Sequence, residues 1–158
     1  MSFLVVLAIV AAILFALPFF TKRRLGVLGL SLAAGAMLSQ LWGGNVTPIV
    51  ASTGIILVRP PLESVVAATI ILLPAVLLLV SGPTYSSFIQ RVVGSLTFTL
   101  LAMALLLPSL GSALVIDGVG KPVYGFLVAQ QTLIVTVCLL LSLADIGLSQ
   151  MRKNHSKH

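Results

Sequence analysis

Five polar side chains recur along a long apolar segment near the C-terminus, and they are the residues best placed to support chemistry. From residue 131 onward their spacings are seven, four, three and four: Gln131, Cys138, Ser142, Asp145 and Ser149. At about 100° per residue, these positions fall within a narrow arc of one helix face. A stripe that includes a carboxylate faces lipid only at a large cost in free energy. We therefore expect this helix to turn the stripe toward neighbouring helices.

Such a stripe suits two kinds of role. It can line a path for a small solute or ion, with Asp145 as the titrating group. It can also join helices, because polar side chains in membrane helices bond to neighbouring helices at about 0.6 kcal/mol each. For Asp145 the joining role implies an ion pair near the membrane surface, with Arg91 or Arg152 as natural partners. We favour the joining role over a transport role.

The residues needed for most enzyme chemistry are missing from the apolar segments. Both histidines, His155 and His158, lie in the C-terminal tail, and the acidic residues Glu63, Asp117 and Asp145 each lie near the end of a predicted helix. Glu63 follows two prolines, a pattern typical of a helix start, where a carboxylate complements the helix dipole. No hydrolase triad, metal-ligand cluster or phosphate-binding loop is visible in the sequence. We expect no enzyme activity, no cofactor and no metal site.

The composition is that of an integral membrane protein. The chain has 158 residues, of which 59% are hydrophobic and 8% charged, whereas a soluble domain is about 25% charged. The net charge of +6 comes from short basic clusters between apolar runs, which orient helices and contact anionic headgroups of the bilayer. No stripe of basic and aromatic residues follows the pattern of a nucleic-acid-binding surface, so nucleic acid is not expected as a partner.

Apolar segments long enough to cross a bilayer predict an all-α integral membrane protein, a single domain with a bundle of about five transmembrane helices. The stretch 43–59 contains a Gly-Gly-Asn sequence and Pro48, which predict a break after Trp42 and a short re-entrant or interfacial segment. The residues 151–158 form a basic tail. The predicted spans are 3–20, 25–42, 62–80, 92–116 and 123–148.

The distribution of positive charge predicts how the chain crosses the membrane. If 43–59 does not cross, seven basic residues lie on one side and two on the other; if it crosses, the split is five against four. The positive-inside rule favours the first arrangement, with the N-terminus outside and the C-terminus in the cytoplasm. The residues expected to determine this topology are Lys22, Arg23, Arg24, Arg152 and Lys153.

Small residues at four-residue spacing mark the second predicted helix as a packing element. Ser31, Gly35 and Ser39 form a ridge along which another helix can approach closely. Such a helix lies inside a bundle or at the seam of a homo-oligomer. The expected partners are the lipid bilayer together with other membrane protein subunits or a second copy of the chain.

Two short motifs resemble a known family. The basic turn Lys22–Gly26 follows the first predicted span, and Gln90–Gly94 opens a later one. In this arrangement the chain resembles the colicin V production protein family, although Gln90 stands where that family tends to carry an acidic residue and the fifth span is additional. The resemblance covers residues 3–116. It implies a small bacterial inner-membrane protein linked to export or envelope maintenance, without chemistry to assign to particular residues.

From these observations we predict an accessory or scaffold protein of a cell-envelope assembly. The alternative is a small channel or transporter that uses the polar face of the fifth helix. The stretch 43–59 is a second pointer to such a path, because irregular backbone at membrane depth is tolerated only where it is buried or lines a cavity.

Overall fold

The structure, a computed structural model, consists of helices that fold into one bundle. It describes residues 3–52, 61–81, 87–113 and 120–155, with side chains for 5–52, 61–80, 87–112 and 120–148. The described part of the chain contains no strand, and its helices are α1 (Phe3–Thr21), α2 (Leu25–Ser52), α3 (Leu62–Ser81), α4 (Phe88–Ala113) and α5 (Gly120–His155). The predicted all-α fold is confirmed.

Length and composition qualify most of these helices as membrane spans. Four of them are long and apolar enough to cross a bilayer, and Val5–Thr21 of α1 forms a shorter apolar helix. At about 1.5 Å per residue, the 19 residues of α1 extend about 28 Å, close to the roughly 30 Å of a bilayer core. The chain is therefore a multi-pass membrane protein by its helices.

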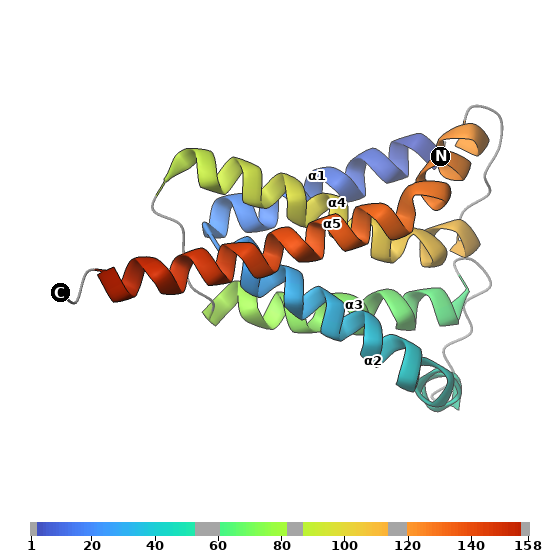
Figure 1. The fold of residues 1–158 in the computed structure, drawn as a ribbon. Coiled ribbons are helices and arrows are strands. Elements are labelled where there is room, and N and C mark those ends of the chain that lie inside the picture. Colours follow the sequence, from blue (N-terminus) through green and yellow to red (C-terminus); the bar gives the residue numbers. More distant parts are fainter. Residues whose placement is uncertain (1–2, 53–60, 82–86, 114–119, 156–158) are drawn as a thin grey trace.

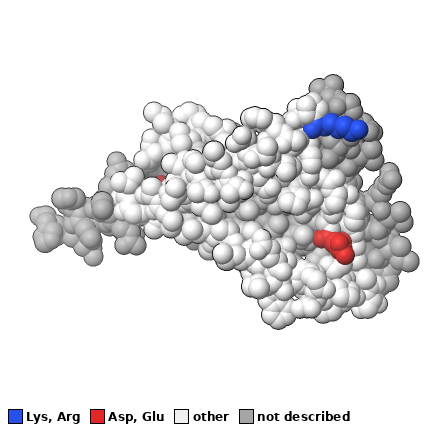
Figure 2. All heavy atoms as spheres, turned by 45° about the vertical axis from the view of Figure 1, so that its right-hand side comes forward, with Lys and Arg blue, Asp and Glu red and all other residues white. Residues whose placement is uncertain are grey.

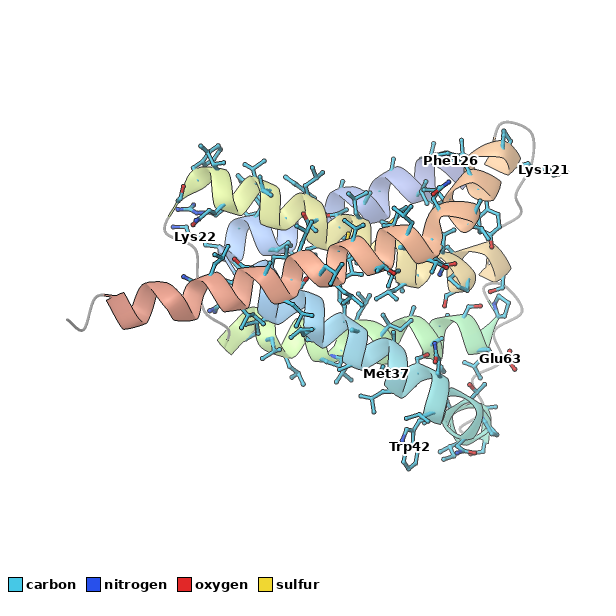
Figure 3. All side chains as sticks on the ribbon, in the orientation of Figure 1. Lys22, Met37, Trp42, Glu63, Lys121 and Phe126 are labelled. Atoms are coloured by element: carbon cyan, nitrogen blue, oxygen red, sulfur yellow. The ribbon has the colours of Figure 1, made fainter. Side chains whose placement is uncertain are left out.

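The helices run alternately in opposite directions, which gives the bundle two distinct ends (Figure 1). α1, α3 and α5 run from the end that holds the N-terminus to the end that holds the C-terminus, and α2 and α4 return. We call the end that holds the C-terminus the basic end. The α1–α2 turn and the start of α4 bring four cations there: Lys22, Arg23, Arg24 and Arg91. Lys22 lies at this end, whereas Glu63 and Lys121 lie at the opposite end (Figure 3).

The stretch between α2 and α3 does not carry the chain from one end of the bundle to the other. α2 ends and α3 begins at the same end (Figure 1). This is the arrangement that separates the basic residues most unequally, as the positive-inside rule favours.

The hydrophobic core forms around α4. In the most apolar stretch of α4, 56% of the residues are buried, whereas the corresponding share for α5 is 11%. Phe98, Leu101 and Leu107 of α4 are almost fully buried, together with Leu28 and Leu32 of α2. α5 lies against this core along one narrow face. The helix with the polar stripe is therefore at the periphery of the bundle and not at its centre.

The outside of the bundle is apolar. Large side chains such as Leu41, Leu77, Phe126 and Leu140 are exposed on different helices. Figure 2 shows a face on which almost all atoms belong to uncharged residues. Exposed apolar surface of this extent is unfavourable in water and suits contact with lipid or with other membrane proteins.

The second helix is longer than the sequence predicts. It does not break after Trp42 but continues through Gly43, Gly44 and Pro48 to Ser52. Pro48 has no N–H to bond to the carbonyl of Gly44, so the helix loses one rung and bends, and its last turns point aside in Figure 1. Two glycines do not end a helix whose backbone groups have no better partner in an apolar medium.

Other predicted boundaries also move. The part of the predicted broken segment at 53–59 lies outside the described residues. α4 begins at Phe88 rather than at residue 92, and α5 runs to His155 rather than to residue 148.

Candidate functional site: a polar seam between α2, α4 and α5

The polar face of α5 lies against α2 and α4. Cys138 and Ser142 are buried, with 4% and 0% of their surface exposed, and Gln131 and Asp145 are half-buried. Leu133 and other large apolar residues on the opposite flank of α5 are exposed. The side chain of Ser149 lies outside the described residues.

Gln131 joins α5 to α4. Its side-chain Nε2 donates a hydrogen bond of 2.9 Å to the backbone carbonyl of Ala104. Cys138 packs within the same apolar core as Leu101 and Ala102 of α4. The hydrogen bond of Gln131 and the packing of Cys138 together fix the position of α5 along the axis of α4.

Ser142 lies where α5 packs closely against α2. Its hydroxyl donates to the carbonyl of Cys138 in its own helix, at 2.9 Å. Opposite stands Gly29, where an added Cβ would be 2.0 Å from Ser142 Oγ and 2.9 Å from its Cβ. Only a residue without a side chain leaves room for this approach.

Asp145 caps the start of α2. The backbone N–H of Gly26 donates to Asp145 Oδ2 at 3.0 Å, across 119 residues of sequence. Gly26 belongs to the first turn of α2, where backbone N–H groups have no partner within the helix and the helix dipole favours a negative charge. A carboxylate from α5 supplies both the acceptor and the charge.

Of the two partners that the sequence suggested for Asp145, Arg91 is not the one observed. Arg91 is described and forms no ion pair with Asp145, and its Nε has no hydrogen-bond partner. The side chain of Arg152 lies outside the described residues, as does that of Lys153. A backbone N–H can replace a cation here because the end of a helix carries about half a positive charge.

We call the contacts of Gly26 with Asp145, of Gly29 with Ser142 and of Ala104 with Gln131 the polar seam. Its residues on α2 are three positions apart, as are their partners Ser142 and Asp145 on α5. Because α2 and α5 run in opposite directions, the two pairs meet in reverse order. The matching spacing is the signal in the sequence that could have identified Gly26 and Gly29.

The basic turn between α1 and α2 is built around one strained residue. Lys22 has a φ of 58°, in the left-handed region, and the N–H of Arg23 donates to the carbonyl of Pro18 at 3.3 Å. This pattern is the Schellman ending of a helix, which usually has glycine at the left-handed position.

Arg23, which the sequence predicts to determine the topology, also binds the end of α3. Its Nε donates to the carbonyl of Leu79 at 2.7 Å, and its Nη2 donates to the carbonyl of Val80. Both carbonyls belong to the last turn of α3, where they lack partners within the helix and carry its negative dipole end. Nothing in the sequence near residue 23 indicates this contact, because its partner is 56 residues away.

The small-residue ridge of α2 packs inside the protein. Ser31 and Gly35 are buried and Ser39 is half-buried. A Cβ on Gly35 would lie 2.3 Å from the carbonyl oxygen of Ile71 in α3. At Gly35 the ridge therefore serves the contact of α2 with α3 within one chain.

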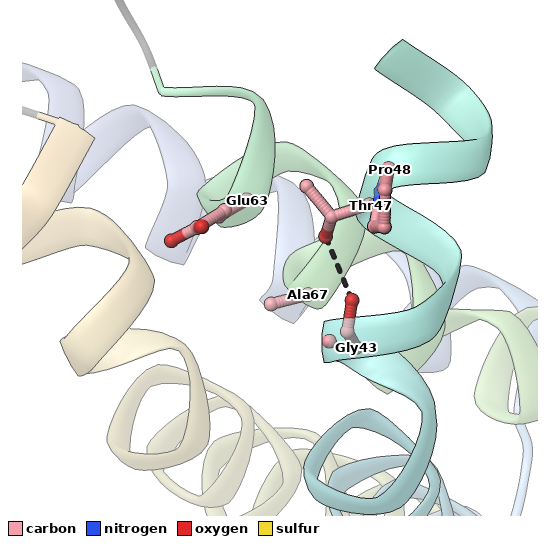
Figure 4. Close-up of a pocket in the computed structure, with 6 residues that line it drawn as sticks. Gly43, Thr47, Pro48, Glu63 and Ala67 are labelled. Carbon is pink, nitrogen blue, oxygen red and sulfur yellow. Dashed lines mark hydrogen bonds between the residues drawn. The ribbon is translucent and has the colours of Figure 1, made fainter. Parts of the chain in front are cut away.

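Two surface pockets lie near the acidic residues. One, of about 540 Å³, forms where α2 bends; Thr47 donates to the Gly43 carbonyl at 2.8 Å on one wall, and the exposed Glu63 stands at the other (Figure 4). The second, of about 280 Å³, lies between α4 and α5 at the basic end. Gln90, Thr97 and Asp145 are the polar residues in its largely apolar lining.

Comparisons with known protein families, curated proteins and solved structures give no match to this chain. The resemblance to the colicin V production proteins stays a prediction based on residues 22–26 and 90–94.

Proposed function

We propose that this protein is a non-catalytic accessory or scaffold subunit of an assembly in the bacterial cell envelope. One observation carries the proposal: Gln131, Ser142 and Asp145 on the polar face of α5 are engaged within the bundle. Gln131 bonds to α4, Ser142 bonds to its own helix against Gly29, and Asp145 caps α2. Polar groups used in this way hold helices in register.

The apolar outer flank of α5 supports the same proposal. Phe126, Leu133 and Leu140 are each at least 60% exposed on α5, the least buried of the four long apolar spans. A flank of this kind can pack against another subunit or against a second copy of the chain. The link to export or envelope maintenance comes from the resemblance at residues 22–26 and 90–94.

A small channel or transporter is the second candidate, and the pocket at Asp145 favours it. There, one carboxylate lies among apolar residues together with Gln90 and Thr97. Intramembrane carboxylates of this kind carry protons or cations in transporters.

The test replaces Asp145 with Asn and Gln131 with Leu. As a scaffold, the protein should lose stability in both variants, with Gln131→Leu lowering the free energy of unfolding by about 0.6 to 1.7 kcal/mol. Unfolding is followed by SDS titration of the purified protein in mixed micelles. Gln130→Leu is the matched control. The side chain of Gln130 is half-buried like that of Gln131, but it makes no hydrogen bond in the described structure.

The same variants are then placed in vesicles that contain a pH-sensitive dye, and proton flux is driven by a potassium diffusion potential. A scaffold predicts equal flux with wild-type protein, with Asp145→Asn and without protein. Proton flux in the wild type that disappears in Asp145→Asn, with stability unchanged, would replace the scaffold proposal by the transport one.

A further inference from the structure

A buried guanidinium nitrogen without an acceptor lies at the basic end. Arg91 is in the first turn of α4, on the face that also carries the buried Ser95 and Phe98, so its side chain starts toward the inside of the bundle. Its Nε is buried and has no hydrogen-bond partner. Proteins leave few charged donors in this state, because the lost bonds to water are not replaced.

The described neighbours of Arg91 do not supply the missing acceptor. Arg23, at the same end, shows the usual outcome, since its Nε and Nη2 bond to the last carbonyls of α3. Asp145, the described acid at this end, accepts from the N–H of Gly26. The described residues therefore leave Arg91 Nε without an acceptor, and a bound anion can supply one.

A second cation lies at the same corner of the bundle. The rings of Phe19 and Phe88 contact edge to face with centroids 6.0 Å apart, which holds the last turn of α1 against the first turn of α4. Lys22 follows directly after α1 and is exposed, at the end opposite to Lys121 (Figure 3). Lys22 and Arg91 thus each follow, by three residues, one ring of the Phe19–Phe88 contact at the basic end.

Exposed apolar side chains adjoin the two cations. Phe20 is 76% exposed, Phe88 63% and Ile89 73%. A ligand that fits both features has an anionic head and an apolar tail. Arginine is suited to the head because its planar guanidinium can bond to two phosphate oxygens at once.

We propose that Arg91 and Lys22 bind the phosphate of an anionic phospholipid at the basic end, with an acyl chain along Phe20 and Phe88. Basic sites between helices bind such headgroups from the cytoplasmic leaflet, which is the leaflet that the positive-inside rule assigns to this end. The site is independent of whether the protein is a scaffold or a transporter.

The test measures lipid binding to the purified full-length protein in a nonionic detergent by native mass spectrometry. The probes are dioctanoyl phosphatidylglycerol and its zwitterionic counterpart, dioctanoyl phosphatidylcholine. We expect preference for the anionic lipid, about tenfold weaker binding in Arg91→Gln, and a smaller loss in Lys22→Gln. Lys121→Gln removes the same charge at the opposite end and should bind as the wild type does.

Equal affinity in the wild type, Arg91→Gln and Lys22→Gln overturns the proposal, as does an equal loss in Lys121→Gln. If Arg91→Gln does not fold, Arg91→Lys is used instead, because it keeps the positive charge but lacks the guanidinium with its Nε. Full affinity of Arg91→Lys for the anionic lipid would overturn the proposed role of the guanidinium. Glycerol phosphate is added as a soluble competitor. If it displaces the lipid at equimolar concentration, the site recognises free phosphate esters, and the lipid is not its ligand.

Discussion

Single charged side chains in this protein bind the ends of helices. Arg23 donates to the last carbonyls of α3, and Asp145 accepts from the first turn of α2. In each case the sign of the charge is opposite to that of the helix end. The protein thereby satisfies backbone groups that have no partner within their own helix.

Lys22 shows a residue whose backbone conformation conflicts with its type. At a φ of 58°, a side chain crowds the following carbonyl, which costs about 1 kcal/mol. We expect Lys22→Gly to raise the free energy of unfolding by about 0.5 to 1 kcal/mol, measured by SDS titration in mixed micelles without added lipid. Lys22→Ala removes the same charge but keeps the strain, so it should give no gain. An equal gain in both variants would assign the effect to the charge.

At the scale of helices, the close packing of α2 depends on glycines, because a side chain at these positions would clash with the neighbouring helix. Gly29 faces Ser142 and Gly35 faces the backbone of Ile71, so α2 meets α5 and α3 on different sides through small residues. The small-residue ridge was visible in the sequence, but its partner helix was not. Gly43 and Gly44 look the same in the sequence, but a Cβ added at either would meet no atom of another helix within 4 Å.

This difference between glycines can be measured. Gly29→Ala places a Cβ against Ser142, and we expect it to destabilise the protein by about 1 to 3 kcal/mol through overpacking. Gly125→Ala in α5 is the control, since nothing lies within 4 Å of its added Cβ. The double variant Gly29→Ala with Ser142→Gly exchanges the two sizes and should recover most of the loss. No recovery would mean that α2 and α5 do not meet at this pair.

At the scale of the whole molecule, composition and periodicity are enough to predict the helices and the inward turn of the stripe. Apolar length and the spacing of residues 131–145 depend only on local sequence. The partners of Asp145 and Arg23 depend on which helices become neighbours, over 119 and 56 residues respectively. The continuation of α2 past Trp42 was missed because Gly and Pro are read as breakers, although an apolar medium penalises an open backbone more strongly.

The topology of the molecule gives a further prediction. In a Cys138→Ser background, single cysteines at the exposed positions Asn45, Lys121 and Ser87 are treated with an impermeant thiol reagent on intact cells. We expect labelling at 45 and 121, which lie at the end with fewer cations, and labelling at 87 only after permeabilisation. Labelling at 87 together with silence at 45 and 121 would invert the orientation.

The cap on α2 also sets an order of events in synthesis. Gly26 emerges from the ribosome 119 residues before Asp145, so α1 to α4 enter the membrane while the first turn of α2 still lacks its acceptor. α5 then packs against Gly26 and Gly29 of α2 and Ala104 of α4. The last helix to be made thus supplies the acceptor for the first turn of α2, and a chain that stops before α5 leaves these three residues open to another helix in the membrane.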